Sequence, residues 1–534
     1  MRRKFRGYGR YLAALTAVVL CLQFSSAVAS TLPDEQKNIV ELAGPNQSLA
    51  QGELFDDLDT WSSIPSQLQP PEDELHRLGL TVSTTCASLM DSKCQKFLAI
   101  NVKAFLPVCD SSATQFCIEE FYALKDGKKV SGIFKGAYPG GVAFGEFSAN
   151  PQYDLPAGAT PGLWELPGLT HDGGTDLYSV SSQLLGSVNR PTINSDFGKM
   201  TINQMWSSIS AVSQTPAPGS KAASASPFGG SGTDLRPQAA SGGQCLVSGN
   251  DNCLVAWPLN QEITYGMQIR IAHPIQGWLH GRISDPDIST STSADGFFHL
   301  KLQGLPVKVP TLFASTPWSA ASAAIKKRFG DQPSGCCGMS GGGQYESAGR
   351  NQSSEEMVSD LNMWLPYVKD TASATPTYWI VRTISDATGN NQKCLINGAV
   401  NGVVTTNATA YTAGAPIFNK ALKSLDYQVA SPHLSPSGTP NIGSYNLQIR
   451  SDVARCLYGF TTAPVAATVS IISNNGVNQV ATTVLSEKNG WIYLKAAGFT
   501  YSNPTVRVVF TQIAQKPQIA QKPQKPSVPT KKKK

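Results

Sequence analysis

Charged residues are scarce in this chain. Asp, Glu, Lys and Arg make up 15% of its 534 residues, against about 25% in a typical soluble domain, whereas hydrophobic residues make up 41%. This combination excludes a coiled coil and a highly charged disordered protein. After residue 29 the sequence also lacks a run of about 20 apolar residues, so we expect no membrane-spanning helix in that part.

Positive charge is scarce between the two ends of the chain. The formal net charge is +6, but five basic residues lie in the first ten positions and seven lie among the last nineteen. Without these two ends, 31 basic and 37 acidic residues remain, a net charge of −6. We therefore do not expect the body of the protein to bind nucleic acid.

The first 29 residues have the pattern of a signal peptide. A basic segment precedes the apolar run 11–24, and Ala27-Val28-Ala29 provides the small-x-small pattern that signal peptidase recognises. We expect cleavage between Ala29 and Ser30 and hence a secreted, extracellular protein. The apolar run is too short to favour a membrane anchor.

Ten cysteines would follow that cleavage site, an even number that suits an oxidising compartment. Six of them form three pairs, each enclosing seven residues rich in turn formers, and we expect a disulfide in each. Zinc favours shorter gaps and reduced cysteine, while a crossed pairing among the first four cysteines stays open. The pairs are Cys86 and Cys94, Cys109 and Cys117, and Cys245 and Cys253.

The remaining cysteines allow three pairings. They are Cys336, Cys337, Cys394 and Cys456. A bridge between the adjacent Cys336 and Cys337 would be strained, so the sequence favours long-range bridges from these two to Cys394 and Cys456.

Short apolar stretches separated by Gly, Pro, Asn and Asp predict a mainly β fold. We expect antiparallel β-sandwich or barrel-like domains with a few short helices, stapled by disulfides. The expected divisions are a signal peptide (1–29), an acidic, loosely ordered leader (30–79) with one short helix near 34–42, a β-rich domain (80–213), a Ser/Gly/Pro-rich linker (214–243), a β-rich domain with two helices (244–417), an antiparallel β-sandwich (418–512) and a Lys/Pro-rich tail (513–534). An internal loop at 214–243 is the alternative to a linker.

The clearest local signals are strands and caps. Expected strands in the first two β-rich domains are 98–105, 116–124, 129–134, 142–147, 254–257, 265–273, 277–283 and 297–309. Thr316 and Pro317 are expected to begin one helix, and Ser353 with Glu356 a second that ends at Pro366. In the last domain, alternation predicts strands at 425–429, 445–449, 465–471, 480–485 and 506–510, with tight turns at Asn475-Gly476 and Asn489-Gly490.

Three stretches resemble uncharacterised secreted proteins of actinobacteria. They are Gly266-Met267-Gln268-Ile269-Arg270, the segment from Gly277 to Arg282, and the segment from Arg450 to Phe460. The resemblance covers most of the chain from about Cys109 onward. It implies export and a β-rich fold, and it brings no activity.

One serine motif fits a hydrolase pattern but lacks its context. Gly338-Met339-Ser340-Gly341-Gly342 matches Gly-x-Ser-x-Gly, which needs a buried strand before it and a helix after it. Neither is predicted, so a glycine-rich loop next to Cys336 and Cys337 is the favoured interpretation. No catalytic residue is therefore assigned.

The weak binding candidates are Trp278, His280 and Arg282, which alternate and so share one face of a strand. An exposed set of this kind would stack on a sugar ring and hydrogen-bond its substituents. The alternative, which we favour, is a structural role with Trp278 in the core.

Acidic residues give no metal site or acid–base pair. The turns 172–176, 250–252 and 285–287 offer oxygen ligands without the full spacing of a calcium loop, so no metal or cofactor is expected. Glu119 and Glu120 are adjacent and should face opposite sides of a strand, which argues against a paired role.

We therefore expect an exported cell-surface or extracellular protein with a non-enzymatic binding or adhesion role. The alternative is a secreted hydrolase acting on polysaccharide or peptide. The Pro-spaced tail at 513–534 carries seven lysines, which would attract anionic cell-wall polymers, unless it is only a solvated terminus.

Overall fold

The computed structural model describes seventeen stretches of the chain. They are residues 33–36, 49–54, 66–80, 85–111, 114–138, 146–216, 245–249, 252–329, 343–348, 354–384, 392–396, 398–412, 414–461, 465–472, 478–479, 482–501 and 505–512. The expected signal peptide, most of the 214–243 segment, Cys336, Cys337, Ser340, Ser353, Asn475-Gly476 and the tail at 513–534 lie outside them.

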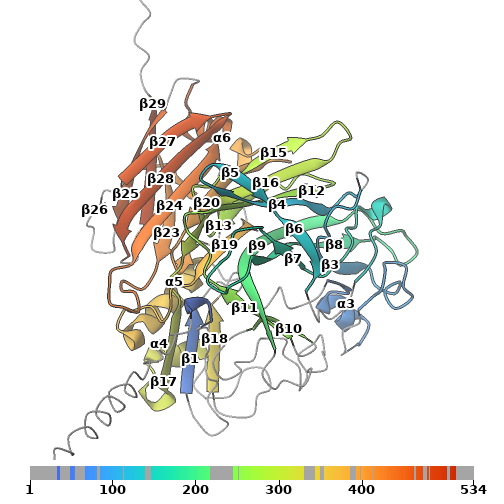
Figure 1. Cartoon of the computed structure of the whole chain (residues 1–534), viewed down its shortest axis with the longest axis horizontal. Coiled ribbons are helices and arrows are strands. Elements are labelled where there is room, and N and C mark those ends of the chain that lie inside the picture. Colours follow the sequence, from blue (N-terminus) through green and yellow to red (C-terminus); the bar gives the residue numbers. More distant parts are fainter. Residues whose placement is uncertain are drawn as a thin grey trace, which may run out of the picture.

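One long sheet runs through the molecule, and a different sheet packs on each of its two halves. Its strands pair in the order β2–β3–β8–β9–β19–β13–β20–β24–β28–β27, with all pairs antiparallel except β13–β20. The bounds are β2 Gln67–Gln69, β3 Ala99–Phe105, β8 Leu177–Asn189, β9 Thr201–Pro216, β19 Thr377–Ile384, β13 Gly277–Gly281, β20 Val400–Thr406, β24 Ile442–Arg450, β28 Trp491–Thr500 and β27 Thr482–Lys488. Figure 1 shows the sheet crossing from β3 and β8 on one side to β27 and β28 on the other.

A second sheet packs on the half of the long sheet that contains β3, β8, β9 and β19. Its strands pair antiparallel in the order β5–β4–β12–β16–β15. Buried side chains of the two sheets form one core, which includes Phe121, Met267, Leu300, Val180 and Trp379. The bounds are β5 Lys128–Ser131, β4 Cys117–Lys125, β12 Thr264–Ile271, β16 Phe298–Lys308 and β15 Ser289–Thr292. Further strands at the margins of these sheets are β6 Ile133–Ala137, β7 Gly162–Glu165, β10 Cys245–Gly249, β11 Asn252–Trp257 and β14 Ile283–Ser284.

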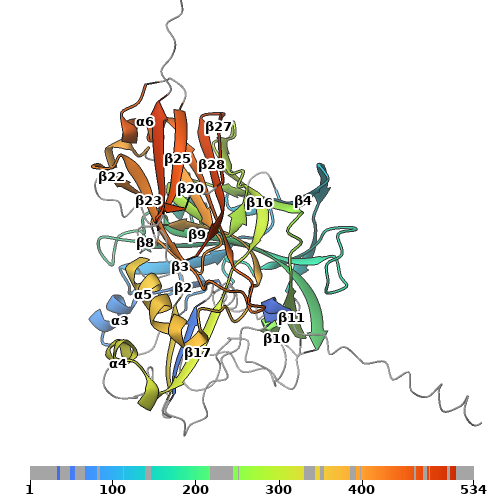
Figure 2. The ribbon, with the colours of Figure 1, turned by 90° about the vertical axis from the view of Figure 1, so that its left-hand side faces the viewer.

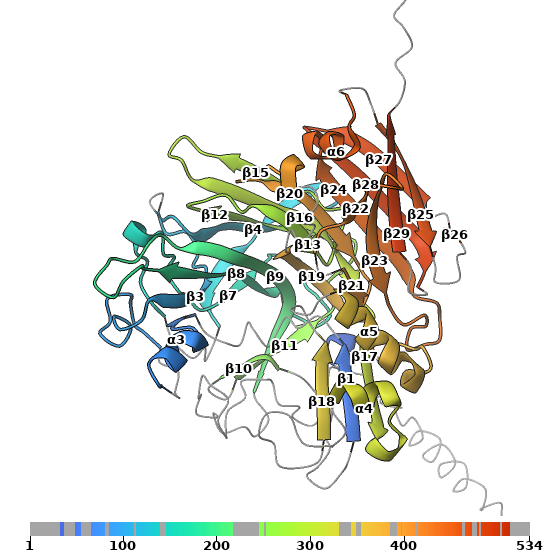
Figure 3. The same cartoon turned by 180° about the vertical axis from the view of Figure 1, so that it is seen from behind.

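A third sheet covers the other half and completes a β-sandwich with β20, β24 and β28. It contains β21 Ala410–Tyr411, β22 Ile417–Asn419, β23 Ser424–Ala430, β25 Val465–Ile472, β26 Asn478–Gln479 and β29 Thr505–Gln512. The alternating residues predicted to face the core do so: Tyr427, Val429, Tyr445, Leu447 and Ile449 are at most 1% exposed. Figure 3 shows this sandwich, in orange to red, from behind.

A small sheet lies beside the sandwich together with α4 and α5 (Figure 2), whereas α3 lies near β3 (Figure 1). β1 (Leu49–Leu54) pairs antiparallel with β17 (Leu312–Pro317) and parallel with β18 (Gly343–Ala348). The α-helices are α3 Glu72–Arg77, α4 Ala323–Phe329, α5 Ser354–Trp364 and α6 Ser451–Tyr458, and short 3-10 turns occupy Asp34–Gln36, Pro151–Tyr153, Trp318–Ala320, Leu365–Val368 and Gln392–Cys394. Among the described residues, no helix is long and apolar enough to cross a membrane.

The predicted fold class is confirmed: the protein is mainly β, with large antiparallel sheets and a few short helices. The division into separate β-rich domains at 80–213, 244–417 and 418–512 is wrong, because sheets cross both boundaries. β9 pairs with β11 on the far side of the 214–243 segment, β4 pairs with β12, and β20 pairs with β24. Strand β9 extends to Pro216, inside the segment 214–243, and residues 217–243 lie outside the described residues.

The acidic leader is tied to the body where the structure describes it, so a loosely ordered leader is wrong there. β1 is built into the small sheet, and the carboxylate of Glu35 accepts hydrogen bonds from the backbone N and the hydroxyl of Thr377, both at 2.7 Å. The expected helix near 34–42 is a single 3-10 turn at Asp34–Gln36, and residues 37–42 lie outside the described residues.

Several helices and strands begin or end at other residues than the sequence predicted. Thr316 is not a helix cap, because it lies in β17 and pairs with Ala50 of β1. The helix begins later, where Ser322 Oγ accepts a hydrogen bond from the backbone N of Ile325. The predicted strand 129–134 is two strands, β5 and β6, and 277–283 is likewise split into β13 and β14. The helix α6 was not predicted, whereas the turn at Asn489-Gly490 is confirmed by positive φ angles at both residues.

Three disulfides are present among the described residues: Cys86–Cys94, Cys109–Cys117 and Cys394–Cys456. The first two are the local pairs predicted from their spacing, and the crossed alternative is excluded. The Cys394–Cys456 bond overturns the long-range bridges expected from Cys336 and Cys337. The side chains of Cys245 and Cys253 lie outside the described residues, although their strands β10 and β11 pair.

Candidate functional site

The outer surface of the β5–β4–β12–β16–β15 sheet is polar. Along β12 and β16 the core-facing residues are buried, and the residues between them project outward. Cross-strand register aligns Arg270 with His299, Gln268 with both Glu120 and Lys301, and Gly266 with both Tyr122 and Gln303. We call this surface the polar face and define it by Glu119, Glu120, Tyr122, Lys129, Gln268, Arg270, His299, Lys301 and Gln303.

A β-bulge places Glu119 on this face. Glu120 pairs with Gln268 and Ile118 pairs with Ile269, so Glu119 is an extra residue between them. Ile118 faces the core, while both Glu119 and Glu120 make contacts on the polar face. The expectation that these two carboxylates face opposite sides of the strand is therefore wrong, because a bulge breaks the two-residue alternation of a regular strand.

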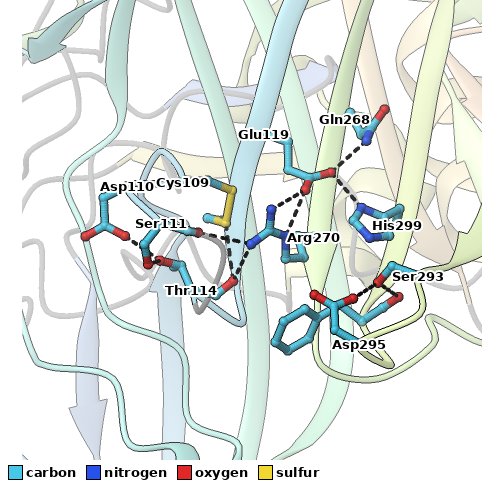
Figure 4. A network of polar contacts seen from close by, with 12 residues as sticks. Cys109, Asp110, Ser111, Thr114, Glu119, Gln268, Arg270, Ser293, Asp295 and His299 are labelled. Carbon is cyan, nitrogen blue, oxygen red and sulfur yellow. Dashed lines mark hydrogen bonds and ion pairs between the residues drawn. A yellow bond between two sulfur atoms is a disulfide. The ribbon is translucent and has the colours of Figure 1, made fainter.

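Glu119 is the centre of a hydrogen-bonded cluster (Figure 4). Its Oε1 accepts from Nε of Arg270 at 2.8 Å and lies 2.7 Å from Nη2 of the same guanidinium. Its Oε2 accepts from Nε2 of Gln268 at 2.7 Å and lies 2.7 Å from Nδ1 of His299. The side chains of Glu119, Arg270 and His299 are 13%, 15% and 17% exposed, so each is held in place yet open to solvent.

These contacts determine the charge of Glu119 and which ring nitrogen of His299 faces it. Burial raises the pKa of Glu119, but the hydrogen bonds from His299, Gln268 and Arg270 outweigh it and hold that pKa below its ordinary value. The carboxylate is therefore ionised at neutral pH, and Nδ1 of His299 must carry the hydrogen that it donates. In neutral His299 this leaves the lone pair on Nε2 as an acceptor, and Nε2 has no hydrogen-bond partner among the described residues.

Two loops flank the cluster. Nη1 of Arg270 donates to the backbone carbonyls of Ser111, at 3.1 Å, and Thr114, at 3.2 Å, in the loop that Cys109–Cys117 closes. On the other side, the β15–β16 turn brings the Phe297 ring centroid within 5.7 Å of the Arg270 guanidinium carbon. The Cys109–Cys117 disulfide thus constrains the loop that orients Arg270.

Ion pairs elsewhere on the polar face balance its charges. Lys129 on β5 lies 2.6 Å from Glu120, and Lys301 lies 2.9 Å from Asp287. Lys129 also sits 4.4 Å from the centroid of the Tyr122 ring, and the Tyr122 hydroxyl donates to Oε1 of Gln303 at 2.8 Å. Arg270 pairs with Glu119, so all three of the cations Lys129, Lys301 and Arg270 have a carboxylate partner.

The predicted candidates Trp278, His280 and Arg282 do not form an exposed face, because they are 2%, 1% and 1% exposed. Trp278 fills the space over Gly402, where an added Cβ would lie 2.2 Å from the indole. The imidazole of His280 stacks on Tyr411 with ring centroids 3.9 Å apart, and Arg282 donates to the carbonyl of Thr406 at 2.9 Å. These side chains are not placed to stack on a sugar.

The acidic turns also have structural partners. Asp176 accepts hydrogen bonds from Thr170 and the backbone N of Gly168, and Asp285 and Asp287 pair with Lys495 and Lys301. Among the described residues, no group of three or more His, Cys, Asp or Glu side chains is arranged to hold a metal ion. Ser340 and residues 250–251 lie outside the described residues.

The sequence did not predict that Glu119 would gather Gln268, Arg270 and His299 into one cluster. The alternation in Gly266-Met267-Gln268-Ile269-Arg270 does signal that Gln268 and Arg270 share an outward face. Nothing local signals the bulge in β4 or the register that brings β16 alongside. Comparison of the chain with protein-family models, curated proteins and solved structures found no match.

Proposed function

We propose that this is an exported cell-surface or extracellular protein that binds an uncharged, polyhydroxylated ligand, such as a segment of polysaccharide, on the polar face. The observation that carries the proposal is the Glu119 cluster. One carboxylate orients a guanidinium, an amide and an imidazole before any ligand arrives, which lowers the entropic cost of binding.

The charge pattern supports an uncharged ligand. Arg270, Lys129 and Lys301 each have a carboxylate partner, so the face offers no unpaired cation to an anionic group. What remains is hydrogen-bonding capacity, including Nε2 of His299 and the amide oxygen of Gln268. Sugar hydroxyls, which both donate and accept, match such a set.

Export and surface retention are the other half of the proposal. The three disulfides suit an oxidising compartment. The lysines of residues 513–534 would hold the protein on anionic wall polymers, although the body has a net charge of −6. Full-length protein should bind purified wall material better than a form ending at Gln512, and 1 M salt should remove the difference because the Debye length falls to about 3 Å. Equal retention of the two forms would refute this part.

A screen of immobilised glycans with the full chain tests the proposed function. We expect retention on a subset of uncharged glycans and a loss of about tenfold or more in affinity for Gln268→Ala, which removes a partner of Glu119 and a ligand-facing amide. Gln152→Ala, at an exposed position outside the face, is the control. No glycan binding, or equal effects of the two substitutions, would refute the proposal.

A further inference from the structure

Ser291 lies directly across from His299 in the paired strands β15 and β16. Side chains at directly opposed positions point to the same face, with Cβ atoms about 4.5–5.5 Å apart. Ser291 is exposed, and its hydroxyl has no hydrogen-bond partner among the described residues. A serine, a histidine and a carboxylate therefore follow one another across the sheet.

The orientation of His299 is the second observation. Glu119 approaches the imidazole through Nδ1, from the β4 and β12 side of β16, whereas Ser291 lies on the β15 side. With Nδ1 engaged, the acceptor Nε2 is left for another hydroxyl. Ser291, His299 and Glu119 thus follow one another across the sheet as the members of a serine–histidine–carboxylate set do, and such sets are defined by geometry and roles rather than by order along the chain.

We propose that Ser291, His299 and Glu119 form a catalytic set that hydrolyses carboxylic esters. Its further detail, that the ester is an O-acyl group on the polyhydroxylated ligand, rests on the proposed function. Ser291 is the nucleophile and His299 the general base. Glu119 orients the imidazole and stabilises its protonated form, and Arg270 and Gln268 are positioning residues that act through Glu119.

The reaction balances without a cofactor. Oγ of Ser291 forms a bond to the ester carbonyl carbon while its proton moves to Nε2 of His299. The bond from that carbon to the alcohol oxygen then breaks, and the alcohol leaves with the proton from His299. Water attacks the acyl-serine with the same general base, which releases the carboxylic acid and restores Ser291.

Ser291 and His299 are not hydrogen-bonded to each other in the structure. A catalytic hydrogen bond between a nucleophile and its base can form only in the complex with substrate. Ser289, two residues earlier on the same strand, lies opposite Lys301 and has no histidine across from it. It is exposed like Ser291, and it therefore provides a matched control.

The test is labelling of the full chain with a fluorophosphonate probe, followed by peptide mass mapping. Attack by Ser291 forms an oxygen–phosphorus bond, expels fluoride and passes the hydroxyl proton to His299. We expect one adduct, on the peptide that contains Ser291. It should be absent in Ser291→Ala, unchanged in Ser289→Ala, and formed about 100-fold more slowly or worse in His299→Gln, since general bases contribute about 10²–10⁴-fold.

Glycan binding by the same variants separates this proposal from the proposed function. Ser291→Ala should keep its affinity for the glycan while losing both labelling and release of acetate from an acetylated glycan. No adduct, an adduct on Ser340 or another serine, or labelling indifferent to His299→Gln would refute the catalytic set. If Gln268→Ala loses glycan binding and the wild type is not labelled, the proposed binding function stands and the proposed catalytic set is refuted.

Discussion

Arg270 meets one oxygen of Glu119 with two nitrogens, Nε at 2.8 Å and Nη2 at 2.7 Å, while its Nη1 holds the disulfide-closed loop through the carbonyls of Ser111 and Thr114. One planar guanidinium therefore joins β4, β12 and the loop. Lysine has a charge at the same position but cannot make these contacts together.

Replacing this guanidinium should destabilise the protein. We expect Arg270→Lys to lower the free energy of unfolding by about 1.5–3 kcal/mol, the range for hydrogen bonds to charged groups, measured by urea unfolding. Wild-type stability in Arg270→Lys would show that the contacts of Arg270 with Glu119 and the loop do not contribute to the fold.

The depressed pKa of Glu119 predicts acid sensitivity with a defined sign. Burial raises this pKa, but the hydrogen bonds from His299, Gln268 and Arg270 together lower it by more than burial raises it. The pKa of Glu119 in the folded protein therefore lies below the ordinary value of 4.5. The unfolded chain then takes up the proton first, so the stabilisation is present above about pH 4.5 and is lost as pH falls through the folded pKa. Urea unfolding should therefore show a stability gap between wild type and Glu119→Gln at pH 7 that narrows at pH 3. A gap that stays constant would contradict this.

The two short-range disulfides provide a matched pair for testing the loop. Each closes a loop with a sequence separation of 8, so replacing either pair by serines should cost about 2–3 kcal/mol of stability. Only Cys109→Ser/Cys117→Ser should also weaken glycan binding, because that loop supplies the carbonyls that orient Arg270. Equal glycan affinity in the two double variants, measured by calorimetry, would remove the loop from the site.

His280 predicts a second pH effect in a different window. Burial, and then the nearby charges of Arg282 and Arg382, lower the pKa of His280 well below 6.5. The folded protein keeps this imidazole neutral, so the unfolded chain binds a proton first and stability falls as pH drops below about 6.5, by up to about 1.4 kcal/mol per pH unit. His280→Phe should remove this slope while keeping a ring against Tyr411.

The slope between pH 7 and pH 5 is measured by urea unfolding of the wild type and of His280→Phe. An unchanged slope in His280→Phe would mean that the unfolded chain gains no proton at this position.

Local patterns predicted the strands of the sandwich well. The alternation of Leu425, Tyr427 and Val429 is explained by a strand with one buried and one outer face. The tight turn at Asn489-Gly490 requires only two adjacent residues that accept positive φ. These features depend on neighbours in the chain. The same is true of the Cys86–Cys94 and Cys109–Cys117 bridges.

The site and the domain plan depend on distant partners, and the sequence alone did not predict them. The two-residue alternation of a regular strand predicted that Glu119 and Glu120 face opposite sides. Only the pairing of β4 with β12 shows that Glu119 is the extra residue of a β-bulge. Thr316 has the chemistry of a helix cap, but pairing with β1 keeps it in a strand. Propensity was overridden by tertiary contacts in both places.

Binding at the polar face is tested by isothermal titration of a glycan retained in the screen into wild type, Arg270→Met and Arg507→Met. Arg507 also pairs with a carboxylate through Nε and Nη2: it donates to the two oxygens of Asp426 in β23, at 2.8 and 2.7 Å, on another sheet. We expect a Kd that is about tenfold or more higher for Arg270→Met and an unchanged Kd for Arg507→Met. Equal Kd values for the two variants would contradict binding at the polar face.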